Sequence, residues 1–299
     1  DADYDKEIKA IEDLELKNGT ATILTDKVKQ GQNIHRKGKD RKQGDVVIQA
    51  NEVLTPAHIA LAATVGKTTI AVKKLPKVAI ISTGDELVAI HEQPTPYQVR
   101  RSNSYTIKAA LEQYCIQANL RHLPEDADIT KTELAVFLKE YDVIILSGGV
   151  SMGKFDHLPH VLEELGVNKL FHKVQQRPGK PFWFGTHADA ALVFAFPGNP
   201  VSTFLCLYRY FIPWLTGKQN ITHAILDEDV TFTPPLQYYM QVRVFIDEQG
   251  KLLASPDEGN GSGDFANLVN TNAFMELPKE ESNFKKGAIY RIWPFKQII

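Results

Sequence analysis

The stretch Asp142-Val-Ile-Ile-Leu-Ser-Gly-Gly-Val-Ser-Met-Gly-Lys-Phe-Asp156 determines the fold that we expect for this chain. It begins with a continuous apolar run, Val143 to Leu146, which is typical of a strand buried on both faces. Gly148 and Gly149 then end the strand and open a small polar loop that closes on a carboxylate. Because glycine lets the backbone approach a ligand closely, the stretch predicts a buried strand followed by a binding loop.

The same order of strand, loop and helix recurs along the middle of the chain. Val78-Ala-Ile-Ile81 is a second continuous apolar run, and residues 119–123 form a further candidate strand. Helical periodicity follows over residues 104–118, with Ser104 as a candidate N-cap, and again over residues 129–140. Repeats of this length predict an α/β domain with a mainly parallel central sheet and helices on both faces.

The two flanking regions lack this repeat. Asn18-Gly19 between two short alternating runs predicts a hairpin, and Thr55-Pro56 starts a helix that is followed by a short strand, Thr68 to Val72. Beyond Ile221 the helical period disappears, and strand-like runs between turns predict a small β domain. We therefore expect residues 1–50 to be a partial β-rich domain and basic linker, 51–75 a helix–strand linker, 76–219 the α/β domain and 220–299 the C-terminal β domain.

Composition excludes several classes of protein. The 34 basic residues nearly balance the 36 acidic ones, so no overall field attracts nucleic acid. The two cysteines, Cys115 and Cys206, lack the spacing of a zinc site or a disulfide framework, which fits a reducing compartment. No apolar run reaches the length of about 18 residues that crosses a bilayer. We expect a cytoplasmic protein that binds a small molecule and neither nucleic acid nor a membrane.

Four loops rich in glycine or proline each follow an apolar run: Thr83 to Leu87, Gly148 to Asp156, Arg177 to Pro181 and Pro197 to Ser202. In an open α/β sheet, ligands bind beyond the carboxyl ends of the strands, so these loops should converge on one crevice. Their glycine backbones, and the positive end of the helix that begins after Pro200, suit a phosphate or similar oxyanion. Lys180 should supply a cation, together with Arg177.

Three carboxylates in these loops, those of Asp85, Glu86 and Asp156, would repel a bare phosphate. A divalent ion such as Mg²⁺, bound by the carboxylates and by phosphate oxygens, removes this conflict. Each loop also has a simpler explanation, because a lone Pro-Gly-Asn-Pro more often reverses the chain and a lone Asp more often caps a helix. Neither a Walker loop nor a dinucleotide fingerprint is present, so only the four loops together indicate a site.

At these loops the chain resembles the molybdopterin molybdenumtransferase family, which includes the bacterial MoeA proteins and the E domain of gephyrin. The matching stretches follow the family's order over most of the chain. They are Gly31-Gln-Asn-Ile34 followed by Arg36 and Gly38, Ser82-Thr-Gly-Asp-Glu-Leu87, Ser147-Gly-Gly-Val-Ser-Met-Gly153 with Asp156, Arg177-Pro-Gly-Lys-Pro181, Pro197-Gly-Asn-Pro-Val-Ser202 and Gly261-Ser-Gly263.

The resemblance implies a MogA-like, molybdopterin-binding α/β domain and a small barrel-like C-terminal β domain. It implies a transferase that inserts molybdate into adenylylated molybdopterin, releases AMP and forms the molybdenum cofactor. It also implies a homodimer that uses Mg²⁺. The alternative is a gephyrin-like scaffold that binds a partner peptide. The related adenylyltransferase shares the fold but lacks flanking β domains, so the residues after Ile221 argue against it.

The resemblance also assigns roles to individual residues by their position in the motifs. Glu125 or Asp126 is similar in position to a further acid of the family, although that match is loose. The expected catalytic residues are Glu86, Asp156, Lys180 and Ser202, with Asp85, Glu86 and Asp156 as metal ligands. The expected substrate-binding residues are Thr83, Gly84, Asp85, Ser147, Gly148, Gly149, Ser151, Arg177, Pro178, Gly179, Pro181, Pro197, Gly198, Asn199 and Pro200.

The chain departs from the family at its N-terminal end. The family begins with a longer region, including a Thr-Gly-Ala-Pro segment, and we expect this chain to lack that region altogether. Gly38-Lys-Asp-Arg41 keeps only Asp40 of an acidic pair that is common in the family. In dimeric relatives the N-terminal region contributes to the partner's site. The chain is then either part of a longer protein or degenerate, and the fragmentary β pattern before Lys29 favours the first.

Overall fold

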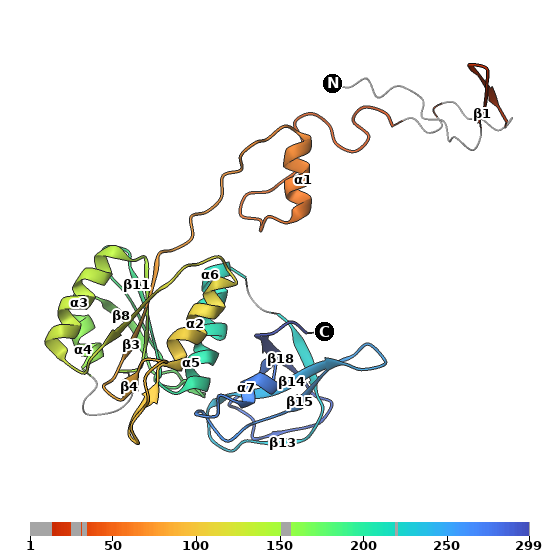
Figure 1. Cartoon of the computed structure of the whole chain (residues 1–299). Coiled ribbons are helices and arrows are strands. Elements are labelled where there is room, and N and C mark those ends of the chain that lie inside the picture. Colours follow the sequence, from red (N-terminus) through yellow and green to blue (C-terminus); the bar gives the residue numbers. More distant parts are fainter. Residues whose placement is uncertain (1–13, 25–30, 32–34, 151–156, 219–220, 299) are drawn as a thin grey trace. The chain divides into compact units, whose positions relative to one another are not determined.

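The structure of the protein is a computed structural model that describes residues 14–24, 31, 35–150, 157–218 and 221–298. The chain divides into two compact units, Asp1–Lys73 and Lys74–Ile299, and each is described by itself (Figure 1). The second unit contains both the central α/β sheet and a β-barrel.

The first unit contains the predicted hairpin and the predicted helix. Strands β1 (Leu14–Lys17) and β2 (Thr20–Ile23) pair antiparallel, and the turn residues Asn18 and Gly19 have φ angles of 51° and 79°, as a type I′ turn requires. Helix α1 (Pro56–Thr64) begins after Thr55, whose N–H donates to Nδ1 of His58 at 3.0 Å. The strand predicted at Thr68–Val72 is wrong. That segment is mostly exposed and has no neighbouring strand to pair with.

The central sheet of the second unit is mainly parallel, as predicted. Its strand order is β6-β3-β7-β11-β10-β8; the first four strands run parallel, and β10 runs antiparallel to both of its neighbours. The register aligns Ser82 of β3 with Ser147 of β7, and Ser147 with Phe196 of β11. The strands are β3 (Val78–Thr83), β6 (Asn119–Leu123), β7 (Val143–Ser147), β8 (Asn168–His172), β10 (Trp183–Thr186) and β11 (Leu192–Phe196).

Helices cover both faces of this sheet (Figure 1). Alternate residues of β3 therefore face opposite helical layers. Ala79 and Ile81 pack with α3 and α4, whereas Val78 and Ile80 pack with α2 and the α5–α6 helix. Each fully buried aliphatic side chain of this kind stabilises the fold by about 1.5–3 kcal/mol. The helices are α2 (Ser102–Glu112), α3 (Ala127–Glu140), α4 (Leu158–Glu164) and α5 (Pro200–Cys206), which continues through a π-helical turn (Leu207–Phe211) into α6 (Ile212–Thr216).

Helix α2 corrects one sequence prediction. It begins at Ser102, directly after the short parallel pair β4 (Leu87–Val88) and β5 (Val99–Arg100). Ser104, the expected N-cap, therefore lies inside the helix and is only 4% exposed. The helix also ends earlier than predicted, at Glu112 rather than near residue 118, and Cys115 has a positive φ of 60°.

The C-terminal β region is a closed barrel. Strands β15, β12, β18, β16 and β14 follow one another, and the long strand β14 closes the ring by pairing with β15 as well as β16. The sequence did not anticipate β12, β16 or the short helix α7. The elements are β12 (His223–Leu226), β13 (Val230–Thr231), β14 (Gln237–Ile246), β15 (Leu252–Pro256), α7 (Asn267–Asn270), β16 (Ala273–Leu277), β17 (Asn283–Phe284), which pairs with β13, and β18 (Ile289–Pro294).

The barrel and the α/β sheet share a hydrophobic core. Strand β9 (Gln176–Arg177) leaves the α/β part and pairs in parallel with the start of β14. Leu205 of α5 is fully buried in a cluster with Tyr239 and Trp293 of the barrel. Loops attached to α5 are therefore held by both the α/β part and the barrel. The domain boundary at 219/220 stays a proposal.

We expect Leu205→Ala to lower the free energy of unfolding by about 2–5 kcal/mol, because it removes buried methyl groups from this shared core. The matched control is Leu170→Ala on the edge strand β8, where the side chain is 54% exposed and the loss should be about 0.5 kcal/mol. Urea unfolding measures both. Equal losses would show that the shared core does not stabilise the unit.

Candidate functional site

Three of the four predicted loops meet where β3, β7 and β11 end. A Cβ atom placed on Gly148 would lie 3.0 Å from the carbonyl oxygen of Thr83, and one placed on Gly149 would lie 2.8 Å from Thr83 Oγ1. A Cβ on Gly198 would lie 3.7 Å from Cα of Gly148. The backbones of these loops are thus in close contact, and the contact requires glycine at residues 148 and 149.

The fourth loop is attached through helix α5. A Cβ on Gly179 would lie 3.0 Å from Sγ of Cys206 and 3.7 Å from the carbonyl oxygen of Ser202. Gln176 is 1% exposed and its Nε2 donates to the carbonyl oxygen of Pro178 at 3.0 Å, across the cis Arg177–Pro178 peptide bond. Within this loop Arg177 and Lys180 are exposed, whereas Pro178 and Pro181 are partly buried.

The Pro197–Ser202 loop is held by the barrel. Asn199 Nδ2 donates to Oγ of Ser262 at 3.0 Å, and the N–H of Val201 donates to the carbonyl oxygen of Ser262 at 3.1 Å. One N–H group at the start of α5 is therefore already bonded and is not available to an anion. Ser202 is 4% exposed, and the buried Pro197 accepts from Oγ1 of Thr203 at 2.6 Å.

A small cavity of about 80 Å³ lies between this loop, the Arg177–Pro181 loop and the barrel. Within it, burial raises the pKa of Tyr238, as does the neighbouring Glu258, and the guanidinium of Arg177 opposes this shift. The cavity therefore combines one cation, one carboxylate and the matched Gly261–Gly263 stretch. Its lining includes Arg177, Pro178, Val201, Tyr238, Glu258, Gly261 and Ser262.

The carboxylates predicted as metal ligands lie on the loop after β3. Asp85 and Glu86 are both exposed. Asp85 Oδ1 accepts a hydrogen bond from the N–H of Glu125 at 3.0 Å, so it already joins the loops after β3 and β6. Asp126 caps α3 by accepting from the N–H groups of Asp128 and Ile129.

A second small cavity, of about 40 Å³, lies at this edge and is lined by Thr83, Glu125, Gly149 and His157 among others. Oγ1 of Thr83 is buried there without a hydrogen-bond partner, and such an unpaired buried group costs about 1–3 kcal/mol. Ser151 and Asp156, two of the predicted site residues, lie outside the described residues.

His122 adds an electrostatic feature that the sequence did not reveal. Its Nδ1 lies 3.1 Å from Oγ of Ser82 at the end of β3. Burial lowers the pKa of His122, the positive charge of Arg101 lowers it further, and Ser82, Asp85 and Glu86 act in the opposite direction. The Asp85–Glu86 loop therefore has a neighbouring imidazole whose neutral form is favoured.

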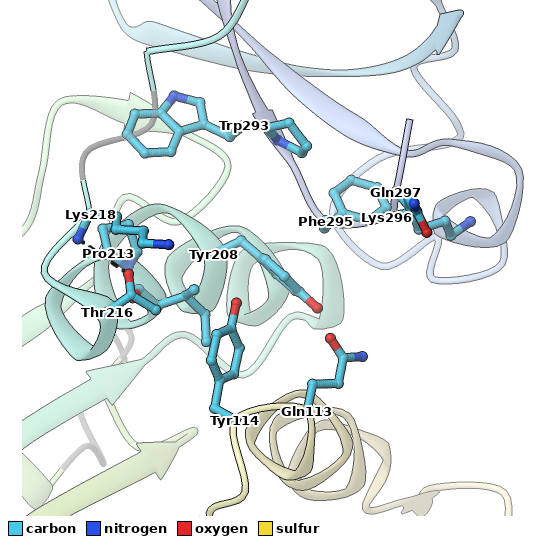
Figure 2. Close-up of a pocket in the computed structure, with 12 residues that line it drawn as sticks. Gln113, Tyr114, Tyr208, Pro213, Thr216, Lys218, Trp293, Phe295, Lys296 and Gln297 are labelled. Atoms are coloured by element: carbon cyan, nitrogen blue, oxygen red, sulfur yellow. Dashed lines mark hydrogen bonds between the residues drawn. The ribbon is translucent and has the colours of Figure 1, made fainter. Parts of the chain in front are cut away.

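A further cavity, of about 770 Å³, lies elsewhere, between the end of α2, helix α6 and the end of β18 with the residues that follow it (Figure 2). It has a volume typical of small-molecule sites and aromatic walls formed by Tyr114, Tyr208, Trp293 and Phe295. Burial raises the pKa of Tyr208 to about 12, with Tyr114 contributing. None of the predicted site residues lines this cavity, so we place the candidate site at the four loops.

In the described part of the chain, no three His, Cys, Asp or Glu side chains are grouped so that they could hold a metal ion by themselves. Within the same ranges, no helix combines the length and apolar character needed to cross a bilayer.

Comparison with known proteins identifies the family. Three family profiles match in sequence order: "MoeA N-terminal region (domain I and II)" over residues 6–66, "Probable molybdopterin binding domain" over 79–217 and "MoeA C-terminal region (domain IV)" over 223–295. The molybdopterin molybdenumtransferase of Haemophilus influenzae is 33% identical over 293 residues, which are 94% of this chain and 71% of the relative. The chain belongs to the molybdopterin molybdenumtransferase family.

Other relatives agree with this assignment. The enzyme of the same name from Synechocystis sp. is 37% identical over 262 residues, covering 87% of this chain and 66% of the relative. A crystal structure of a molybdopterin biosynthesis MoeA protein from Pyrococcus horikoshii has a TM-score of 0.72 and 28% identity, covering 95% of this chain and 70% of that one. The predicted α/β fold with a barrel-like C-terminal region is thereby confirmed.

The N-terminal expectation needs correction. Because the profile of the N-terminal region matches residues 6–66, part of that region is present rather than lacking altogether. This chain nevertheless spans only about two thirds of the length of the curated relatives, 66%, 71% and 62% for the first three.

We expect Gly149→Ala to destabilise the fold more than Gly250→Ala. Both glycines have positive φ, 69° and 78°, but a Cβ at Gly250 meets nothing within 4 Å, whereas one at Gly149 meets Thr83 Oγ1. Gly250→Ala should cost roughly 1–2 kcal/mol from its backbone conformation alone. Overpacking should add about 1–3 kcal/mol at Gly149. Chemical denaturation compares the two, and equal costs would contradict the close packing of the loops.

A pH-dependent stability is expected from His122. Since its pKa is lowered by folding, the unfolded chain takes up the proton first as the pH falls below about 6.5, and stability declines until the pH passes the folded pKa. His122→Gln should remove this part of the decline, and His91→Gln, at an exposed position, should not. Unfolding free energies at pH 7.5 and 5.5 test this expectation. A decline unchanged in His122→Gln would disprove it.

Proposed function

We propose that this protein inserts molybdate into adenylylated molybdopterin, releases AMP and thereby forms the molybdenum cofactor. The observation that supports this most is the convergence of the motif-bearing loops at the carboxyl ends of β3, β7 and β11. Family membership and the names of the relatives agree with it. A convergent polar site of this kind is where an open α/β sheet binds its ligand.

In this proposal the chain's own residues position the substrate's phosphates. The backbones of Gly148, Gly149 and Gly198 allow close approach, and the exposed Lys180 supplies a cation. Arg177 at the end of β9 and Ser202 in the first turn of α5 are our candidates for binding the oxyanion of molybdate. Ser202 is largely buried, so its contribution requires that the oxyanion reach the base of the crevice.

The carboxylates fit a Mg²⁺ ion. Mg²⁺ commonly uses one or two protein carboxylates and takes its remaining ligands from phosphate oxygens and water. Asp85 and Glu86 offer such exposed oxygen ligands on adjacent residues, and we assign Asp156 to the same set. When bound, the ion would supply positive charge at the pyrophosphate link. Asp85 would keep its bond to the N–H of Glu125, which orients its carboxylate.

The scaffold alternative receives less support. The relatives carry the name of the enzyme, and the acidic and basic residues of the loops are retained in this chain. A protein that only bound a partner peptide would not need Glu86, Lys180 and the close glycine contacts at one place.

We also propose a cytoplasmic homodimer. The free cysteines, Cys115 and Cys206, fit a reducing compartment, and burial raises the pKa of the Cys206 thiol, which packs in the core. Sedimentation of the purified chain would test the dimer.

The activity assay uses the purified chain with adenylylated molybdopterin and molybdate, and follows AMP release and cofactor formation. We expect Glu86→Gln and Asp156→Asn to lower the rate by at least about 100-fold, because charge stabilisation is lost where the reaction occurs. Glu140→Gln and Asp189→Asn are matched controls at exposed positions, on α3's last turn and in the β10–β11 turn, and should keep full activity. No turnover by the unchanged chain would refute the proposal, and full turnover by both site variants would remove the carboxylates from it.

A further inference from the structure

Within the described residues, the side chain of Asn103, which lies outside the four loops, is bonded both to Ser147, where the Gly148 loop begins, and to Gly198 of the Pro197–Ser202 loop. It lies in the first turn of α2, where its Nδ2 donates to Oγ of Ser147 at 3.0 Å and to the carbonyl oxygen of Gly198 at 2.7 Å. Its partners are the last residue of β7 and a residue that follows β11, and they are 44 and 95 residues away in sequence. One half-buried amide therefore connects two separate substrate loops of the proposed site.

The orientation of this amide is determined by its partner. The carbonyl oxygen of Gly198 can only accept, so the atom 2.7 Å from it must be the NH₂ group. Both hydrogens of that group are then used, one for each loop. Replacing the NH₂ by an oxygen would remove both donors and place two acceptors against each other.

The backbone pairing of the sheet ends just before these loops. The last link between the two strand ends is the hydrogen bond from the N–H of Gly148 to the carbonyl oxygen of Phe196, at 3.1 Å. Beside it, among the described residues, the two bonds of Asn103 connect Ser147, one residue before Gly148, with Gly198, two residues after Phe196. They therefore set the distance between the loops where the backbones of Gly148 and Gly198 approach.

We propose that Asn103 is a positioning residue that holds the Gly148–Gly149 and Pro197–Asn199 loops at the spacing that receives the phosphates of the adenylylated substrate. This inference rests on the proposed function. It concerns phosphate because successive glycine N–H groups at positive φ form concave anion sites, and Gly148 and Gly149 have φ angles of 99° and 69°. A displacement of about 1 Å in such a site can cost about 100-fold in function.

The test is Asn103→Asp, which keeps the shape of the side chain and removes the NH₂ donors. The matched control is Asn119→Asp at the start of β6, where Nδ2 of the same residue type donates to the hydroxyl of Tyr141 at 2.6 Å, at the opposite end of the sheet. Calorimetric titration with adenylylated molybdopterin at pH 7.5 should give a Kd raised about 100-fold for Asn103→Asp and within twofold of the unchanged protein for Asn119→Asp.

A pH series separates positioning from general loss of stability. A protonated aspartic acid has one O–H donor and can again bond the carbonyl oxygen of Gly198. The difference in Kd between Asn103→Asp and the unchanged protein should therefore narrow at least threefold between pH 7.5 and pH 5. Circular dichroism checks that both proteins are folded at each pH. If Asn103→Asp does not fold, Asn103→Ser, which is too short to join the loops, takes its place and should show the same loss at pH 7.5.

The outcomes are distinguishable. If the unchanged protein does not bind adenylylated molybdopterin, the proposed function fails. If it binds, but folded Asn103→Asp or Asn103→Ser binds within threefold of it at pH 7.5, the proposed function stands and the role of Asn103 is wrong. A loss of equal size in Asn119→Asp would likewise reject the positioning role, since it would reflect a general effect of the substitution.

Discussion

The register of the parallel strands β3, β7 and β11 is the constraint on which the site depends. Because these strands are buried on both faces, a slip of one residue would send every side chain of a strand to the other face, from one helical layer to the other. The register is therefore fixed by core packing, and it places Ser82, Ser147 and Phe196 side by side. The loops that follow start from a common edge before any ligand is present.

Close packing then limits how the loops can continue. Gly148 and Gly149 contact Thr83 with no room for a side chain, and the barrel's Ser262 holds the start of α5 through two hydrogen bonds. The barrel is thus part of the site's support, because the same helix carries Leu205 into the core shared with the barrel. A substitution in that core should therefore shift the Pro197–Ser202 loop.

Local sequence patterns predicted the strands and the hairpin better than they predicted the contacts that hold the site loops in place. Apolar runs such as Val143–Leu146 and the Asn18-Gly19 turn are encoded by neighbouring residues, so the buried strands and the hairpin were predicted correctly. Asn103, the Asp85–Glu125 bond and the pairing of β12 depend on partners distant in sequence, and no spacing signals them. The expected strand at Thr68–Val72 failed for the same reason, since an extended segment becomes a strand only beside another.

The acidic residues at this edge of the sheet differ in the hydrogen bonds that they already make within the protein. Asp126 is a helix cap and Asp85 bonds a backbone N–H, so both already compensate part of their charge within the chain. Glu86 folds back over Gly84, where a Cβ would lie 2.7 Å from its Cδ, so glycine at residue 84 determines where this carboxylate can lie. An exposed carboxylate held in this way by the backbone conformation beside it is arranged to meet an external positive charge more than to stabilise the fold. We therefore propose Glu86 for the chemical role, and we propose that Asp85 contributes to the metal site while its bond to Glu125 orients it.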